Sequence, residues 1–532
     1  MTAQADLIVV ADAIHGAGDA VTAQALAVTG DRFTYVGSAA GALALRGPQT
    51  AVLDAGAQTV LPGIVDAHLH LTYLGLKLQQ VDLDGSGSHD ELVERTKAFA
   101  QRASDEWIIG RGWDETLWRS SAFPSNEALS AALPDRPVAL ARVDGHALLA
   151  NARAVAIAGV DESTADPPGG RIARAGNGKP TGIFVDAAID LIYAKVPKPS
   201  HERLVRATRA AIAECNRWGI TAVAEPGCDE AVLAAHAALL ATDEYSIRNY
   251  VMLDHDASLI EAHARRGIVD GAYNGRLWVR AIKVYADGAL GSRGAALLAP
   301  YSDDGENTGL ILTPGERIES VTAAALQTGF QVCVHAIGDR ANRMVLDAYE
   351  RALAGAAPGA DPRLRIEHAQ VVTREDVRRF AKLGVIPSMQ AAHALSDMAW
   401  ARARLGPERI LDAYAWRSLL DAGTIVANGT DAPVESPSTA RTFYASIGCG
   451  GWYPQEGMSR SEALASMTIW AARANFQEGI IGSIAPGKFA DFVVMDRDWM
   501  TIEPNEILQT KVICTYFGGR RVYGAPLTDN VR

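Results

Sequence analysis

Two histidines one residue apart, His68 and His70, close the short apolar run LPGIVDAHLH that begins at Leu61. Along an extended strand, residues i and i+2 point to the same side, so both imidazoles can reach one point. Such an arrangement suits a divalent cation, because imidazole nitrogen is a common metal ligand. A His-x-His pair is also frequent by chance, so the metal hypothesis requires further ligands elsewhere in the chain.

Further side chains of the right type stand near the ends of later apolar runs. They are Lys283, His335, His368 and Asp431. Each histidine alone could be a satisfied core residue, and the aspartate alone could belong to a turn or a helix cap. The histidines and Asp431 occupy the same relative place on their runs, however, and the carboxyl ends of barrel strands meet on one rim. This joint pattern favours a metal site.

Lys283 lies among apolar neighbours in the run LWVRAIKVYADG, where a buried lysine needs a partner. Two interpretations stay open. One is a buried salt bridge to a carboxylate such as Asp287. The other is carbamylation by carbon dioxide, which would turn the side chain into a carboxylate able to bridge two cations. We favour carbamylation.

The elements that must position these residues are eight strand-like runs that alternate with helical patterns. This alternation is typical of βα units and a parallel sheet, and eight units indicate an α/β fold of the (β/α)8 TIM-barrel type. The runs lie at 61–66 and near residues 220, 246, 277, 331, 363, 384 and 423.

Short strands separated by glycine and aspartate turns occupy residues 1–60, and a similar texture returns at 480–532. We expect these two ends to pair into a small β-sandwich domain, with the barrel at 61–479 between them. About 150 residues separate the first two barrel strands, where a βα unit needs about 30. Residues 75–200 are therefore expected to be an insertion that forms a lobe or lid over the barrel mouth.

The composition of the chain argues against some classes of binding partner. The net charge of −12 argues against nucleic acid or an anionic membrane surface. The five cysteines form no Cys-x-x-Cys pair, as expected of reduced core residues in a cytoplasmic protein. No basic leader opens the chain, and no apolar run approaches the roughly 20 residues of a membrane span. We expect a homodimer that acts on a small-molecule substrate.

Taken in order, the motifs VDAHLH, the lysine, VHAIGD, RIEHAQ, NGTDAPVE and GSIAPGKFADFVVMD resemble the amidohydrolase superfamily of metal-dependent barrels. The finer motifs GRGWDE, RVDGHALLAN, KPTGIFVDAAIDLI, DGALGSRGAAL and SMQAAHALSDMAW resemble its amidohydrolase-3 branch, which includes N-substituted formamide deformylases. The resemblance extends from about residue 5 to residue 525.

The resemblance implies a set of roles. His68 and His70 would bind one metal, and His335 and His368 a second. Carbamylated Lys283 would bridge them, and Asp431 would be both ligand and proton carrier. One departure from the branch concerns His393, which follows Ala391 and Ala392 where a proline and a threonine are common. This departure bears on substrate contacts near His393 and leaves the metal site intact.

The expected chemistry is hydrolysis of a C–N bond in an amide, N-acyl amine or carbamate. One or two bound ions, Zn²⁺ by expectation and Mn²⁺, Co²⁺ or Fe²⁺ as alternatives, would lower the pKa of water from ~15.7 to roughly 7 and so supply hydroxide. Ester or lactone hydrolysis, deamination and isomerisation are alternatives on the same rim. A non-catalytic binding barrel is a further alternative, although no rim residue is missing.

Substrate specificity is expected from the inserted region and the loops. Trp113 and Asp114 in GRGWDE could supply a ring wall and a polar anchor, and His146 in RVDGHALLAN could be a catalytic donor to the carbonyl oxygen. The structural alternatives are a core tryptophan with a turn aspartate, and a histidine bonded to backbone. Arg293, in a glycine-rich loop, could pair with a substrate carboxylate, and His393 is a further candidate contact.

Overall fold

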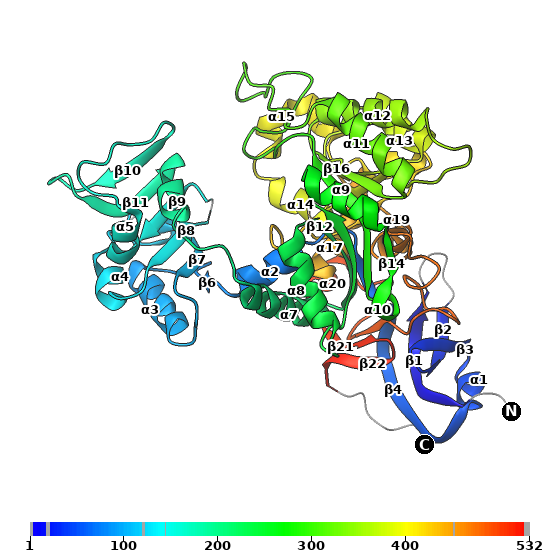
Figure 1. Ribbon diagram of the computed structural model, residues 1–532. Helices are drawn as coiled ribbons and strands as arrows, with labels where there is room; N and C mark the ends of the chain where they lie inside the picture. The colour runs from blue at the N-terminus through cyan, green and yellow to red at the C-terminus, as the bar shows by residue number, and fades with distance from the viewer. Residues whose placement is uncertain are drawn as a thin grey trace. The chain divides into compact units, whose positions relative to one another are not determined.

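The computed structural model describes residues 4–16, 22–119, 123–143, 145–448, 450 and 453–525 (Figure 1). The chain divides into two compact units. One joins Met1–Leu74 to Thr208–Arg532, and the other is Gly75–Ala207. Within the described ranges, no helix has the length and apolar character needed to cross a membrane.

Eight parallel strands of the first unit form a near-closed barrel, so this prediction is confirmed. They are β5 (Ile64–Asp66), β12 (Ile220–Cys228), β13 (Arg248–Leu253), β15 (Leu277–Tyr285), β16 (Gln331–Ala336), β17 (Arg365–His368), β18 (Ile386–Met389) and β19 (Ala427–Asn428). Their order in the sheet is β19-β18-β17-β16-β15-β13-β12-β5. Ala67 N, just after β5, donates to Asn428 O of β19 at 3.1 Å and brings the two outer strands together.

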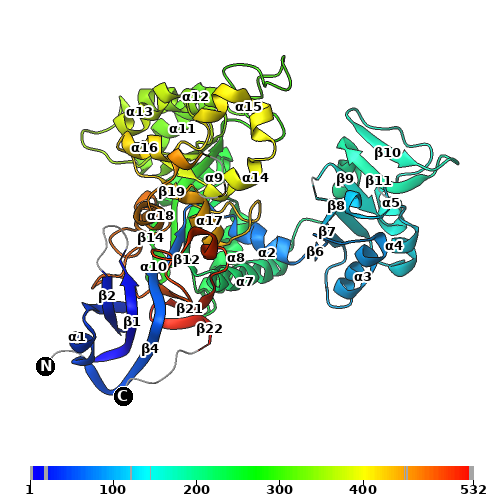
Figure 2. The same cartoon turned by 180° about the vertical axis from the view of Figure 1, so that it is seen from behind.

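Helices cover the outside of this sheet, which explains why its strands are buried on both faces. Every residue of β13, β17 and β18 is buried. In both views α11 (Gly315–Thr328), α12 (Asp339–Leu353) and α13 (Arg374–Leu383) lie together on one side of the barrel (Figures 1 and 2). The predicted rim residues lie at the carboxyl ends of the strands and in the loops that follow them.

Strands from the two ends of the chain form one seven-stranded mixed sheet, so the predicted pairing is confirmed. The strands are β1 (Ala5–His15), β2 (Thr22–Thr29), β3 (Arg32–Gly37), β4 (Arg46–Pro62), β20 (Phe492–Met495), β21 (Val512–Phe517) and β22 (Arg520–Gly524). Their order is β22-β21-β20-β4-β1-β2-β3. The sheet curls on itself: the Phe33 ring of β3 lies 6.2 Å from that of Phe492 in β20. The curled sheet encloses an apolar core, as a sandwich does.

The terminal sheet continues directly into the barrel. Only Gly63 separates β4 from β5, and a Cβ at this position would lie 2.2 Å from Thr221 Oγ1, so glycine is required here. Gly63 N donates to Asp491 O at 2.9 Å. The Asp491 carboxylate in turn accepts two bonds from the buried Arg248 of β13, at 2.6 and 2.9 Å. These bonds join the terminal sheet to the barrel wall.

The second unit, inserted after the first barrel strand, has its own six-stranded sheet. The strands are β6 (Val81–Asp82), β7 (Ile108–Trp113), β8 (Val138–Arg142), β9 (Ala147–Ala150), β10 (Gly170–Arg174) and β11 (Pro180–Asp186), in the order β10-β11-β9-β8-β7-β6. Two apolar clusters cover its faces. The inserted lobe predicted from the spacing of the barrel strands is therefore present.

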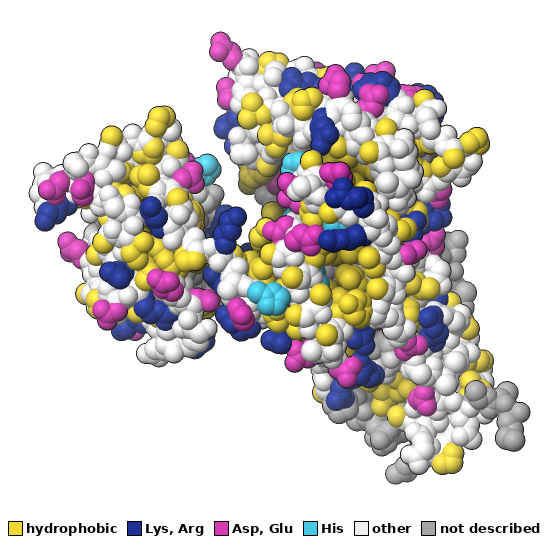
Figure 3. Space-filling model, in the orientation of Figure 1, with side chains coloured by type: hydrophobic (Ala, Val, Ile, Leu, Met, Phe, Trp, Pro, Cys, Tyr) yellow, Lys and Arg dark blue, Asp and Glu magenta, His cyan; other side chains and the backbone are white. Residues whose placement is uncertain are grey.

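Acidic and basic side chains are interspersed on the face of the molecule drawn in Figure 3. Among the residues described on that face, the basic side chains do not gather into a continuous patch.

Candidate metal centre

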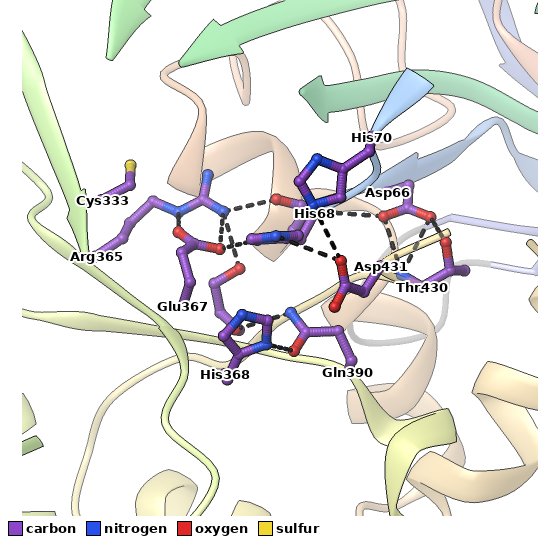
Figure 4. A network of polar contacts seen from close by, with 12 residues as sticks. Asp66, His68, His70, Cys333, Arg365, Glu367, His368, Gln390, Thr430 and Asp431 are labelled. Atoms are coloured by element: carbon purple, nitrogen blue, oxygen red, sulfur yellow. Dashed lines mark hydrogen bonds and ion pairs between the residues drawn. The ribbon is translucent and has the colours of Figure 1, made fainter. Parts of the chain in front are cut away.

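The His68 imidazole, which follows β5, is fixed from one side by a carboxylate. His68 Nδ1 lies 2.5 Å from Glu367 Oε2, and both side chains are buried. Arg365 holds the other Glu367 oxygen at 2.8 Å (Figure 4). An ionised Glu367 selects the tautomer in which Nδ1 carries the proton, and this leaves the lone pair of Nε2, 3.6 Å from Asp431 Oδ1, free to bind a cation. Metal-ligating imidazoles are commonly oriented by a carboxylate in this way.

Asp431, just beyond β19, lies among three histidines. Its Oδ1 is 3.4 Å from His70 Nε2 and 3.6 Å from His68 Nε2. Its Oδ2 is 3.6 Å from His393 Nε2. The backbone at Asp431 has a φ of +56°, a left-handed conformation that is costly for a residue other than glycine and is often found at functional sites.

Asp66, the last residue of β5, holds the Asp431 loop in place. Its carboxylate accepts bonds from Thr430 Oγ1 at 2.7 Å, Thr430 N at 3.0 Å and His68 N at 3.0 Å (Figure 4). Burial raises the pKa of Asp66 to about 7, against the opposing effect of these bonds. One side chain therefore fixes the backbone of both His68 and the residue before Asp431.

His368, the last residue of β17, is oriented by Gln390, whose Oε1 lies 2.6 Å from His368 Nδ1. Its φ is +74°. The ligand atoms of His68, His368 and Asp431 lie within 4.8 Å of one another. The His335 ring centroid is 4.5 Å from that of His368, but His335 Nε2 faces Gly288 O at 3.5 Å. The rim residues whose ligand atoms are close enough together to share an ion are therefore His68, His368 and Asp431.

The ionisation states of these groups suit metal binding. Burial, together with the nearby Lys283, lowers the pKa of His68 to about 4 and that of His335 to about 3. Burial also lowers the pKa of His368 well below its usual range. Burial acts to raise the pKa of Asp431, but the nearby His70, His68, His368 and His393 hold it well below its usual range. At neutral pH His68, His335 and His368 are thus neutral imidazoles, and Asp431 is a carboxylate.

Lys283 of β15 is buried with its ammonium 5.0 Å from the centre of the Tyr285 ring. No carboxylate in the described part of the chain pairs with it. Asp287, the partner considered from the sequence, instead accepts bonds from three backbone N–H groups at 2.8–2.9 Å. Burial lowers the pKa of Lys283, which favours the uncharged amine. The salt-bridge interpretation is therefore not supported.

The residues present fit a divalent cation. Asp431 Oδ1 and His393 Nε2 are buried, and neither has a hydrogen-bond partner among the described residues. Buried polar atoms are normally satisfied, so these two atoms call for a further partner. Nitrogen and carboxylate donors of this kind suit Zn²⁺ and similar ions. The residues of the candidate site that would hold an ion are His68, His368 and Asp431.

Comparison with known proteins decides the family. Residues 51–523 match the model described as "Amidohydrolase family". The chain belongs to the amidohydrolase family. It is 33% identical to Protein LONG AFTER FAR-RED 3 of Arabidopsis thaliana, over 98% of this chain and 92% of that protein. It is 32% identical to the putative amidohydrolase YtcJ of Bacillus subtilis, over 90% and 91% of the two chains.

Two further proteins are similar to this chain. An N-substituted formamide deformylase of Arthrobacter pascens is 27% identical, over 93% of this chain and 94% of that protein. A solved structure of an uncharacterized metal-dependent hydrolase from Pyrococcus furiosus is 27% identical with a TM-score of 0.79, over 93% and 100% of the two chains. The resemblance seen in the motifs is thus confirmed, and the protein is an amidohydrolase-superfamily hydrolase with a candidate His/His/Asp metal site.

Two candidate substrate contacts of the amidohydrolase lie in the barrel unit. His393, in α14 (Ala391–Asp397), stacks on His368 with ring centroids 6.2 Å apart and so lies at the metal site. Arg293 makes two bonds to Asp303 at 3.1 Å each. A substrate carboxylate would have to compete with Asp303 for this guanidinium.

The other three candidates lie in the inserted lobe. Trp113 is fully buried in its core and donates to Leu140 O at 2.7 Å. Asp114 caps the 3₁₀ helix Glu115–Leu117 and pairs with Arg142 at 3.0 Å. The largely exposed His146 lies 2.8 Å from Asp186. Trp113 and Asp114 thus have the contacts of the structural alternatives, and the substrate roles of all three stay predictions.

Sequence reasoning missed the residues that orient the ligands. They are Asp66, Arg365, Glu367 and Gln390. A signal for them exists, because each is a polar residue inside or directly beside an apolar strand run. Charged residues are almost never fully buried unless paired. Glu367 and Arg365 within RIEH therefore had to find partners in the barrel.

Proposed function

We propose that this amidohydrolase cleaves a C–N bond of a small molecule, an amide, N-acyl amine or carbamate. The observation that carries the proposal is the position of Asp431, whose carboxylate lies 3.4–3.6 Å from the Nε2 atoms of His68, His70 and His393. A carboxylate in this position can serve both as ligand and as proton carrier. The similarity to a protein named N-substituted formamide deformylase supports a C–N bond as the target.

The cation, Asp431 and His393 have different roles in the proposed hydrolysis. A divalent cation, Zn²⁺ in this proposal, would supply Lewis acidity and lower the pKa of water from ~15.7 to roughly 7. Asp431, ionised at neutral pH, accepts a proton from the attacking water and returns it to the leaving nitrogen. His393 Nε2, which is buried and has no hydrogen-bond partner in the described chain, would donate to the substrate carbonyl oxygen.

Lys283 belongs to the proposal as a carbamylated ligand between two ions. Its burial, its lack of a carboxylate partner in the described chain and its place on β15, the strand that pairs with the His335 strand β16, support this role. Carbamylation would replace an ammonium, which repels a cation, by a carboxylate. Elemental analysis of the purified protein tests the number of ions, with about two per chain expected if the bridge is present.

The test of function is a hydrolysis screen of N-acyl amines, carbamates, lactams and esters with the metal-loaded protein. We expect turnover of one C–N class, its loss after treatment with a chelator, and its return on addition of Zn²⁺. Hydrolysis at the same rate by metal-free protein would contradict the mechanism. Turnover of esters alone would assign the site to the alternative class of leaving group.

A further inference from the structure

Helix α2 (Leu71–Leu78) begins directly after the metal-site residue His70. His70 occupies the N-cap position, since its carbonyl accepts the first helical bond from Leu74 N at 2.8 Å. A serine, threonine, aspartate or asparagine in this position would bond a backbone N–H of the first turn. The His70 ring lies against Asp431 instead, 3.4 Å away. The first turn of α2 therefore needs a cap from elsewhere.

Glu225 of β12 provides this cap. Its Oε1 accepts a bond from Thr72 N at 2.8 Å, although 153 residues separate the two in the sequence. A carboxylate in this place also complements the positive end of the helix. The same strand holds the segment at a second point, where Leu69 N donates to Ala224 O at 3.0 Å. Strand β12 thus fixes the backbone on both sides of His70.

A closed set of buried groups holds the Glu225 carboxylate. His236 Nε2 lies 2.8 Å from Glu225 Oε2, and Asn249 Nδ2 donates to the same oxygen at 2.7 Å. The Tyr245 hydroxyl lies 3.1 Å from His236 Nδ1. Both oxygens of Glu225 and both nitrogens of His236 are thereby engaged within the protein. For this reason the nearby Cys228 does not make this cluster a second metal site.

We propose that Glu225, backed by His236, is a positioning residue for the metal ligand His70. The inference rests on the proposed function, because it requires His70 to bind the ion. Without the carboxylate, Thr72 N loses its partner and the turn that carries His70 is less constrained. Groups that orient metal ligands typically contribute about 10- to 100-fold to metal affinity. Loss of Glu225 should therefore weaken metal binding without removing any ligand.

The experiment measures the Zn²⁺ affinity of the full-length protein by competition with a chromophoric chelator. The variants are Glu225→Ala, Glu225→Gln and a control, Asp491→Asn. Asp491 is a buried carboxylate of the same unit that pairs with Arg248. We expect Glu225→Ala to bind about ten-fold more weakly or worse, and Asp491→Asn to bind as wild type. Glu225→Gln should recover much of the affinity, because its amide oxygen can accept the bond from Thr72 N.

Hydrogen exchange followed by mass spectrometry gives a second readout that needs no activity. The peptide that spans residues 70–74 should exchange faster in Glu225→Ala than in wild type, and at the wild-type rate in Asp491→Asn. A Glu225→Ala protein with wild-type affinity and wild-type exchange would overturn the inference. A Glu225→Ala protein that is less stable than wild type but binds Zn²⁺ with wild-type affinity would overturn it as well.

A second variant covers the case in which Glu225→Ala does not fold. Tyr245→Phe removes the hydroxyl beside His236 Nδ1 and keeps the ring, and we expect it to weaken Zn²⁺ binding several-fold. Unchanged affinity would then overturn the inference. Wild-type protein that binds no divalent ion would instead overturn the proposed function and this inference with it. Zn²⁺ binding by wild type that is insensitive to Glu225 and Tyr245 overturns the inference alone.

Discussion

Glu367 Oε2 lies 2.5 Å from His68 Nδ1, while the next residue in the chain, His368, contributes its own imidazole to the same group of ligand atoms. Two successive residues of β17 thus act on the site in different ways. His368 supplies a ligand atom, and Glu367 fixes the imidazole of another strand. The dipeptide joins the first and the sixth barrel strands through the centre of the site.

Glu367→Gln should lower Zn²⁺ affinity by about 10- to 100-fold, because an amide holds the Nδ1–H of His68 less strongly than a carboxylate does. Competition with a chelator measures the affinity. Glu375→Gln is the control, since its carboxylate is 78% exposed and pairs with Arg343. Equal affinities for the wild type and Glu367→Gln would show that Glu367 does not orient the ligand.

Lys283→Ala should reduce the number of bound ions from about two to about one, because the proposed bridge is lost. Lys283→Glu supplies a carboxylate on a shorter side chain and should retain more metal than Lys283→Ala. Elemental analysis gives the number of ions. The intact mass of the wild type, recorded under gentle conditions, should include one added carbon dioxide. Unchanged stoichiometry in Lys283→Ala would show that this lysine is not a bridge.

Asp431→Asn should lower kcat by about 10²- to 10⁴-fold, the usual range for loss of a general acid–base group. The midpoint of urea unfolding should change little, since the amide keeps the size of the side chain and one oxygen. Asp339→Asn is the matched control, because Asp339 is a buried carboxylate that accepts a bond from Leu298 N. If Asp431→Asn loses stability to the same degree as it loses activity, Asp431 has a structural role.

The buried Glu225–His236 pair should make stability depend on pH at the acid end. Burial acts to raise the pKa of Glu225, but His236 and the hydrogen bonds lower it to about 2. A folded-state pKa below the unfolded value stabilises the folded protein above about pH 4.5, and this contribution fades as the pH falls toward 2. Wild type should exceed Glu225→Gln in free energy of unfolding by up to roughly 3 kcal/mol near neutral pH.

Urea unfolding at a series of pH values checks this dependence. The difference between wild type and Glu225→Gln should narrow steadily below about pH 4.5, whereas Glu244→Gln, an exposed partner of Arg209, should show no such trend. A difference that stays constant down to about pH 3 would refute the assigned direction.

The sequence predicted the parts of the fold that depend on local pattern. The eight barrel strands follow from apolar runs, and the rim residues His68, His368 and Asp431 follow from their places at strand ends. The orienting contacts could not be predicted, because they join positions such as His68 and Glu367 that only the closed barrel brings together. The role of Trp113 depended on burial, which a motif does not reveal. The homodimer and the cytoplasmic location stay predictions.

The continuous strand from β4 into β5 has a consequence for synthesis of the chain. The edge of β4 pairs with β20, so Leu61 has its partner in Val493, more than 400 residues later. Nearly the whole polypeptide must therefore be synthesised before β4, the strand that leads to His68, can form its hydrogen bonds with β20. A chain that stops before residue 492 should accordingly leave this edge of β4 unpaired.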